Sequence, residues 1–317
     1  MLVSRELDLM YEKMDVELQC EECLYLDSIF TGGFEKFLDR DTDRYMKVPE
    51  EIILFDHVYY RRGYVSRGSS GYIFQFIQKV HADFIQRRRE AHSMRDLPPP
   101  KDSQLPPEAR PIVLKVVDRE ECREKTNIQY LKRNDLQFEG LISSELHNNG
   151  ESIDNYYYVI MPQCLPLDRY AAFGHTKRDV VRQVADALLE LRARDLYYCD
   201  LKFANIMIST AGKIKLVDIG SIVIGLGRTG SSSFPPIRKH KEGLVVADDQ
   251  TLLWTFLVFV VDFVFDVEIM PLHFATSEEE KIAYYIDVLL KHDRLGPYLI
   301  SPVDTLENSI ERLIDLI

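Results

Sequence analysis

One segment, Tyr197–Ser221, constrains the fold of this chain more than any other. Within it, two short strand-like runs, Ile206–Ser209 and Lys213–Val217, are separated by Thr-Ala-Gly. A glycine at the end of such a turn, here Gly212, can adopt the positive φ that a tight reversal of the chain uses. The segment therefore predicts a β-hairpin, and a hairpin returns its two ends to the same edge.

Polar residues stand at both ends of this predicted hairpin. Asn205 precedes it and Asp218 follows it, so these two side chains are expected to lie side by side. Asp200 and Lys202 occupy the loop just before. Two carboxylates, one amide and one ammonium at one edge can hold a divalent metal ion and position a hydroxyl group for attack on a phosphoryl group.

The composition limits the classes of function that fit. A chain of 317 residues with 46% apolar content can bury a large core, in one large domain or in two lobes. Its net charge of −12 argues against a nucleic-acid partner. Five cysteines, an odd and sparse set, favour a reducing compartment over a disulfide framework.

The sequence also bears on location. The first residues lack the apolar core of a secretion signal. The apolar run Leu252–Phe265 is too short to span a bilayer and contains Asp262, so it predicts a buried helix. The expected location is therefore cytoplasmic or nuclear, without a membrane span.

The pattern of the sequence divides the chain into three parts and predicts an α+β protein. Residues 1–50 are acidic and predict a helical N-terminal extension. Residues 51–163 hold strand candidates and are interrupted at 81–110 by a proline-rich loop insertion. Residues 164–317 predict a mainly helical part. The expected elements are strands at Ile52–Tyr60 and Tyr156–Met161, helices at Arg178–Arg194, Leu252–Phe265, 278–292 and 303–317, and a long loop at Ser221–Gly243.

A Gly/Ser-rich turn, Ser66–Ile73, connects two strand candidates in the β-rich part. Its small residues let backbone N–H groups approach phosphates, although a plain hairpin turn is also a sufficient explanation. Further on, Lys115 lies inside the apolar strand candidate Pro111–Val117. An unpaired buried ammonium is costly, so Lys115 must face a polar pocket or a carboxylate, unless it faces water at a sheet edge.

A carboxylate partner for Lys115 is expected from the next predicted helix, which starts near Gln137 and is ended by Gly150. Glu139 is the first candidate and Glu145 the second. The alternative for either residue is a solvated charge on the surface of that helix.

Taken in order over roughly residues 52–265, these motifs resemble those of the protein kinase family. The resemblance implies a bilobal fold with an antiparallel β-rich N-lobe and a mainly helical, short C-lobe. It implies that ATP is held by the glycine-rich turn, by the strand lysine with its helix glutamate, and by a hinge after the gatekeeper residue. The corresponding positions here are Gly68, Ser69, Ser70, Gly71, Ile73, Lys115, Glu139, Met161, Pro162 and Cys164.

The same resemblance implies chemical roles around Asp200, whose surroundings are similar to the catalytic loop HRDLKxxN. Asp200 would be the catalytic base, Lys202 would support the γ-phosphate, and Lys115 would position the phosphates. Asn205 and Asp218 would be the ligands of Mg²⁺, or of Mn²⁺. The implied function is an ATP-dependent serine/threonine protein kinase, and the acidic chain suggests a basic protein substrate.

The chain also departs from the family pattern. Tyr198 replaces the loop histidine, and Cys199 replaces the arginine that reads activation-loop phosphate, so a switch through that pair is not available. Ser66 replaces the first glycine and Ile237 a glutamate, whereas Asp249 resembles the anchoring aspartate of the long C-lobe helix. These changes leave a pseudokinase, acting as a nucleotide-binding or scaffold module, as the alternative. A small-molecule kinase of related fold is a third class.

Overall fold

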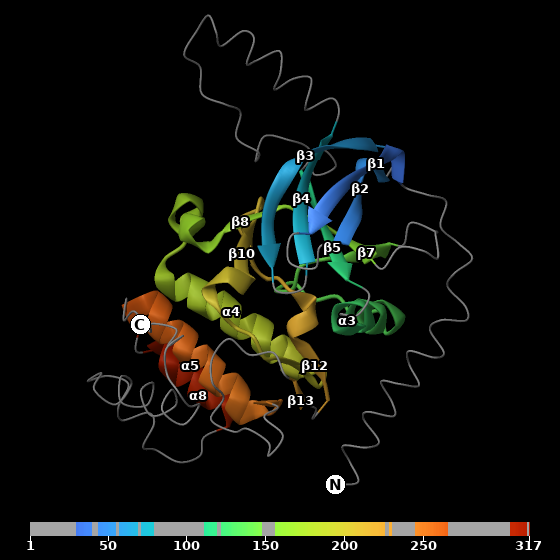
Figure 1. Cartoon of the computed structure of the whole chain (residues 1–317). Coiled ribbons are helices and arrows are strands. Elements are labelled where there is room, and N and C mark those ends of the chain that lie inside the picture. Colours follow the sequence, from blue (N-terminus) through green and yellow to red (C-terminus); the bar gives the residue numbers. More distant parts are fainter. Residues whose placement is uncertain are drawn as a thin grey trace, which may run out of the picture. The chain divides into compact units, whose positions relative to one another are not determined.

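The computed structural model describes residues 30–39, 44–54, 57–68, 71–78, 111–118, 122–147, 156–225, 228–229, 245–265, 305–315 and 317. They belong to two compact units, each of which is treated by itself. Unit 1 holds the described residues up to Leu136, with 143–164 and 209–211; unit 2 holds 137–142, 165–208 and the described residues from Gly212 onward. Strands and helices are both present, which confirms the predicted α+β class (Figure 1).

Unit 1 is built on a curled antiparallel sheet of seven described strands, in the order β1-β2-β3-β4-β5-β7-β6 (Figure 1). Every neighbouring pair is antiparallel. The curl of the sheet brings β1 close to β7. The ring centroids of Phe30 in β1 and Tyr158 in β7 are accordingly 4.9 Å apart. The strands are β1 (Phe30–Asp39), β2 (Arg44–Leu54), β3 (His57–Gly68), β4 (Gly71–Gln78), β5 (Ile112–Asp118), β6 (Glu145–His147) and β7 (Tyr156–Pro162).

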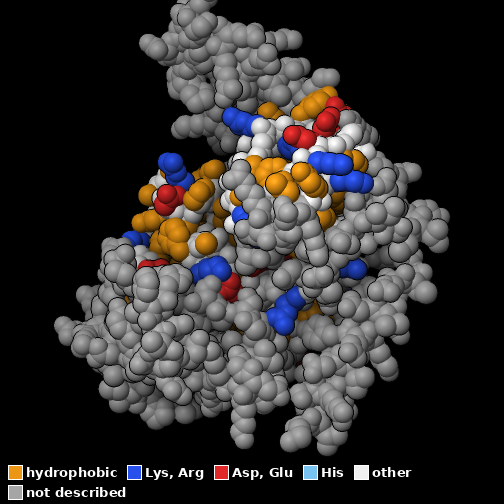
Figure 2. All heavy atoms as spheres, viewed as in Figure 1, with side chains coloured by type: hydrophobic (Ala, Val, Ile, Leu, Met, Phe, Trp, Pro, Cys, Tyr) orange, Lys and Arg blue, Asp and Glu red, His pale blue; other side chains and the backbone are white. Residues whose placement is uncertain are grey.

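Apolar side chains from six of these strands form the core of unit 1. Alternate residues take part, such as Leu114 and Val116 of β5, because successive side chains of a strand point to opposite faces. Fully burying a side chain of this kind stabilises the fold by about 1.5–3 kcal/mol. Other hydrophobic residues, including Tyr64 and Val65, stay exposed, and Figure 2 shows hydrophobic side chains beside Lys and Arg on the surface of this sheet.

The predicted helical extension is wrong for its described residues 30–39 and 44–50, which form β1 and the first part of β2. The strand predicted at Ile52–Tyr60 is likewise divided between β2 and β3. Apolar residues at positions 46, 48 and 52 of β2 reach the core, a spacing of two that suits a strand and not a helix. Residues 1–29, the 81–110 insertion and the helix predicted at 278–292 lie outside the described residues.

The helix predicted around Glu139 is also wrong. The helix of this region is α3 (Cys122–Arg133), whereas 137–144 are not helical and Glu145–His147 is strand β6. The last turn of α3 carries Lys132 and Arg133, whose positive charges suit the negative end of a helix dipole. The buried residues of α3 are largely polar: Glu124, Thr126, Asn127 and Gln129.

Unit 2 is organised around helix α4 (Lys177–Arg192), which packs against β9, β11, α5 and α8. Thr176 caps it: its hydroxyl accepts from the Asp179 backbone N–H, and the Asp179 carboxylate accepts from the Thr176 N–H. The prediction of this helix is confirmed. The side chains that it buries are Val180, Val181, Val184, Ala185, Ala187, Leu188 and Leu191.

The remaining predictions for unit 2 are largely confirmed. The hairpin forms, with Gly212 at φ +83°, and the buried helix is α5, where Asp248 accepts from the Thr251 N–H at 2.8 Å. The predicted loop at Ser221–Gly243 instead starts with a strand, β12. Further elements are β8 (Cys164–Pro166), β9 (Leu196–Tyr198), β10 (Ile206–Ser209), β11 (Ile214–Leu216), β12 (Ile222–Ile224), β13 (Arg228–Thr229), β14 (Val245–Val246), α5 (Asp249–Phe265), α8 (Leu306–Asp315) and the short 3-10 turns Leu167–Phe173, Phe203–Asn205 and Ile219–Ser221.

No helix in the described part of the chain is long and apolar enough to cross a membrane.

The segment 137–142 belongs to unit 2 because it joins the hairpin as a third strand-like stretch. Leu216 donates its N–H to the carbonyl of Gly140 at 2.7 Å and accepts from the N–H of Ile142 at 3.0 Å. Gly140 lies directly on α4: a Cβ at this position would be 2.2 Å from the Cβ of Ala187.

Gly140→Ala is therefore expected to lower the free energy of unfolding by roughly 2–3 kcal/mol, since the added methyl group forces the hairpin away from the helix. Gly63→Ala is the matched control, because no atom lies within 4 Å of the added Cβ there. Urea unfolding of both variants measures the difference. Equal stability of the two would contradict the contact at Ala187.

Candidate active site

Asp200 lies in the loop after β9, with its side chain almost fully buried. Lys202 Nζ donates to Asp200 Oδ2 at 2.7 Å. Asn205 Nδ2 donates to the same oxygen at 3.1 Å and to the Asp200 carbonyl at 2.9 Å. The ammonium and the amide together compensate a buried carboxylate and fix its direction, as charge-assisted hydrogen bonds do.

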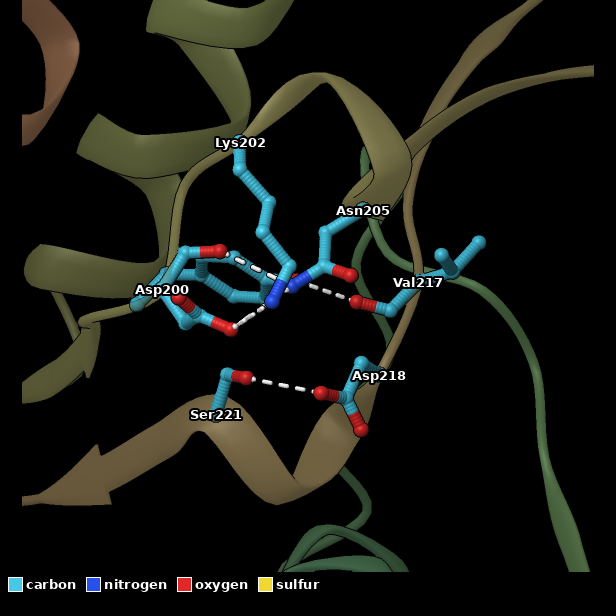
Figure 3. A network of polar contacts seen from close by, with 7 residues as sticks. Asp200, Lys202, Asn205, Val217, Asp218 and Ser221 are labelled. Atoms are coloured by element: carbon cyan, nitrogen blue, oxygen red, sulfur yellow. Dashed lines mark hydrogen bonds and ion pairs between the residues drawn. The ribbon is translucent and has the colours of Figure 1, made fainter. Parts of the chain in front are cut away.

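Asp218 follows β11 and lies close to Asp200 and Asn205 (Figure 3). The N–H of Val217 donates to the carbonyl of Asn205 at 2.9 Å, so the two ends of the hairpin are joined next to Asp200. The hairpin thus brings Asn205 and Asp218 to one edge, as the sequence predicts. Ser221 Oγ donates to Asp218 Oδ2 at 3.0 Å.

The backbone of Asp218 is unusual. Its φ of 64° and ψ of 69° are in the left-handed region, which non-glycine residues rarely adopt. The Ser221 N–H donates to the Asp218 carbonyl at 3.0 Å and closes this turn. Non-glycine residues held in such conformations often belong to functional sites, which makes Asp218 a candidate on geometry as well as on sequence.

Tyr198 is fully buried, and its hydroxyl donates to the carbonyl of Val217. Burial raises the pKa of Tyr198 well above its ordinary value. The charges of Asp218 and Asp200 raise that pKa further, and hydrogen bonds with Ser221 and Asn205 lower it. Tyr198 is therefore a neutral hydroxyl at the centre of the polar network.

Two connections hold the segments that lead into this loop, β9 and the end of α4. Strand β9 pairs with β12, so that Tyr198 stands opposite Ile222. Arg192, at the end of α4, donates to both oxygens of Asp249 at 2.6 and 3.0 Å, and this pairing raises the pKa of Arg192. Asp249 at the start of α5 is thus joined to the end of α4.

Unit 1, considered by itself, holds a buried ion pair. Lys115 Nζ lies 2.8 Å from Glu124 Oε2, with 6% and 3% of the side chains exposed. Lys115 is in β5, between β4 and β7, so the alternative of an edge-strand lysine facing water is wrong. A buried charge pair of this kind is weak evidence for stability, but loss of one partner would leave the other charge buried and uncompensated.

The predicted pairing of Lys115 with Glu139 is wrong. The Glu139 side chain is 73% exposed and lies 3.1 Å from Lys213, and its backbone carbonyl accepts from Lys215. The second candidate, Glu145, lies 3.4 Å from His147, and the hydrogen bond with this histidine lowers the pKa of Glu145. The glutamate of α3, Glu124, is the partner.

The glycine-rich turn forms the β3–β4 hairpin, with Gly68 opposite Gly71. Ser69 and Ser70 lie outside the described residues. A Cβ on Gly71 would be 2.3 Å from the carbonyl oxygen of Val116, so this glycine is already required by the close approach of β5. In β4, Ile73 stands opposite Lys115 of β5.

The predicted hinge follows β7. Met161 is buried, whereas Pro162 is exposed. The N–H of Gln163 is taken up by the carbonyl of Pro111 at 3.0 Å. Cys164 begins β8 and is partly exposed.

The donors around Asp218 fit a weakly held metal ion better than a dedicated metal cage. No group of three or more His, Cys, Asp or Glu side chains gathers among the described residues. Asp218 and Asn205 offer a carboxylate and an amide oxygen, because the amide nitrogen of Asn205 faces Asp200. Mg²⁺ is commonly bound by one or two such groups together with substrate phosphates, so the set fits Mg²⁺.

Sequence reasoning missed two residues of this site. Glu124 has a signal, since it follows the strand of Lys115 on a helix that can be recognised by its basic last turn. Ser221 has none beyond its position three residues after Asp218. The sequence matches no known protein-family model.

Proposed function

We propose that this chain is an ATP-dependent protein kinase of the serine/threonine type, with a bilobal kinase-like fold. The observation that carries the proposal is the arrangement in unit 2. Asp200 is directed by Lys202 and Asn205, and Asp218 lies at the other end of the same hairpin in a left-handed conformation. Phosphoryl transfer requires such an arrangement, because its catalysis is mostly positioning and charge neutralisation.

Each residue then has a distinct task. Asp200 orients the hydroxyl group of the protein substrate and accepts its proton. Lys202 orients the Asp200 carboxylate and offers its ammonium to the γ-phosphate. Asp218 and Asn205 would hold Mg²⁺, which would neutralise the phosphate charge.

Lys115 has the corresponding task in unit 1. A buried lysine paired at 2.8 Å with a buried glutamate presents its ammonium at a fixed place. The proposal assigns this ammonium to the phosphates of ATP. It also assigns Gly68, Gly71, Ile73 and the hinge at Met161–Cys164 to the nucleotide. The Glu139 side chain has no part in it, and Glu124 takes its place.

The test is transfer of labelled γ-phosphate by the purified full-length chain, alone and with a generic basic protein as acceptor. Transfer is expected with Mg²⁺ and is expected to stop when the metal is removed with EDTA and return when Mg²⁺ is added back. Labelled serine or threonine in the product identifies the acceptor class.

Two outcomes would contradict the proposal. Binding of ATP without transfer to any protein indicates the alternative, a pseudokinase that serves as a nucleotide-binding or scaffold module. Transfer to a small hydroxylated molecule but to no protein indicates a small-molecule kinase. The acidic charge of the chain supports a basic protein acceptor, which is why that acceptor is used first.

A further inference from the structure

Two hydroxyl groups that the proposed reaction does not use lie against Asp218. Ser221 Oγ donates to Asp218 Oδ2 at 3.0 Å. The Tyr198 hydroxyl donates to the carbonyl of Val217, in the peptide that leads into Asp218. One contact fixes the direction of the carboxylate, and the other fixes the backbone that carries it.

The two residues are also held to each other. The N–H of Cys199, next to Tyr198, donates to the Ser221 carbonyl at 3.0 Å, and Tyr198 stands opposite Ile222, next to Ser221, in the β9–β12 pair. Both Tyr198 and Ser221 are buried, with 0% and 2% exposure. Solvent therefore has little access to replace either hydroxyl group.

Asp218 needs such support because its backbone is left-handed, a conformation that an L-residue keeps only when its surroundings enforce it. The Ser221 N–H, at 3.0 Å from the Asp218 carbonyl, supplies part of that support. The Ser221 hydroxyl adds a direction to the side chain, which the backbone contacts by themselves do not give.

We propose that Ser221 and Tyr198 are positioning residues that hold the Asp218 carboxylate in the orientation in which it binds a divalent metal ion. The inference rests on the proposed function, which gives Asp218 the role of a metal ligand. Residues that hydrogen-bond a metal ligand typically contribute ~10–100-fold to metal affinity. Ser221→Ala is accordingly expected to weaken metal binding by about tenfold.

The experiment measures binding of Mn²⁺ to the full-length chain by electron paramagnetic resonance, with a saturating non-hydrolysable ATP analogue present. Ser221→Ala and Tyr198→Phe are each expected to raise the Kd for Mn²⁺ by about tenfold. The double variant is expected to show less than the product of the two effects, because both residues act on Asp218. Tyr197→Phe is the matched control: it is the same change one position earlier, on a ring that faces Arg192.

Thermal unfolding without metal or nucleotide shows whether each variant is folded, and either single variant suffices for the test. An unchanged Kd for Mn²⁺ in the folded variants would overturn the inference and leave the proposed function standing. A loss of thermal stability with an unchanged Kd would do the same, because it would mark a purely structural role. Absence of Mn²⁺ binding by the wild-type chain would contradict the proposed function and this inference together.

Discussion

Asp218→Asn is expected to reduce phosphoryl transfer by about a thousandfold or more while leaving the fold intact. Asparagine tolerates the left-handed backbone that this position requires, and its amide oxygen can accept the hydrogen bond from Ser221. The substitution therefore removes the negative charge and little else. That charge is what a divalent metal ion on the phosphates needs from the protein.

Asp195→Asn is the matched control. Asp195 is another aspartate with a left-handed backbone, at φ 55°, but its side chain is exposed. The control is expected to keep the wild-type rate of transfer and the wild-type melting temperature. Initial rates with labelled ATP at saturating Mg²⁺ compare the three proteins. A rate of Asp218→Asn within a few-fold of wild type would remove Asp218 from the active site.

Glu124→Gln is expected to reduce kcat/KM for ATP by about a hundredfold, whereas Glu139→Gln leaves it unchanged. Glutamine keeps the size of Glu124 and a hydrogen-bond acceptor for Lys115, but it leaves the buried ammonium without its opposite charge. Lys115 then no longer has a single favoured place. Glu139 is the control that the sequence itself supplies, since it is exposed and pairs with Lys213.

Steady-state kinetics with varied ATP measures both glutamate variants, and thermal unfolding shows that both are folded. Lys115→Met is expected to lose at least as much transfer as Glu124→Gln. Equal losses for the two glutamate variants, or a loss for Glu139→Gln only, would contradict the assignment of Glu124.

The sequence predicts those elements of the fold whose signals are local. The β10–β11 hairpin follows from two apolar runs and Gly212, and α4 follows from a helical apolar pattern whose predicted positions are mostly buried. The prediction that Lys115 of β5 needs a polar partner follows from the cost of a lone charge in an apolar run. At these places local propensity and tertiary packing agree.

The prediction fails at α3, where the buried face is polar. Glu124, Thr126, Asn127 and Gln129 are buried, so the helix carries little of the apolar periodicity by which helices are recognised. The following residues 137–146 hold apolar residues at helical spacing but pair as strand-like segments instead. The apolar pattern places the helix after Lys115 one segment too late along the chain. It therefore offers glutamates of the wrong segment as partners of Lys115.

The two N-terminal strands were missed for another reason. Charged residues are frequent in β1 and β2, for example Glu35 and Lys36 beside Phe34 and Phe37, which conceals their alternation. A register shift between Thr31 and Phe34 interrupts it further. Ser221 was missed because a hydroxyl group acquires a role here only through the turn that folds it back on Asp218.

The course of the chain through the two units has a consequence for dissecting the protein. After α3 the chain leaves unit 1 for the six residues 137–142, which belong to unit 2, and then returns to unit 1. A fragment that starts at 165 lacks Gly140 and Ile142, and with them both backbone partners of the buried residue Leu216. A fragment that ends at 164 carries those six residues without the hairpin they bind. Neither half is a natural unit for separate expression, so truncation is a poor route to the role of either part, and point substitutions in the full chain are the better one.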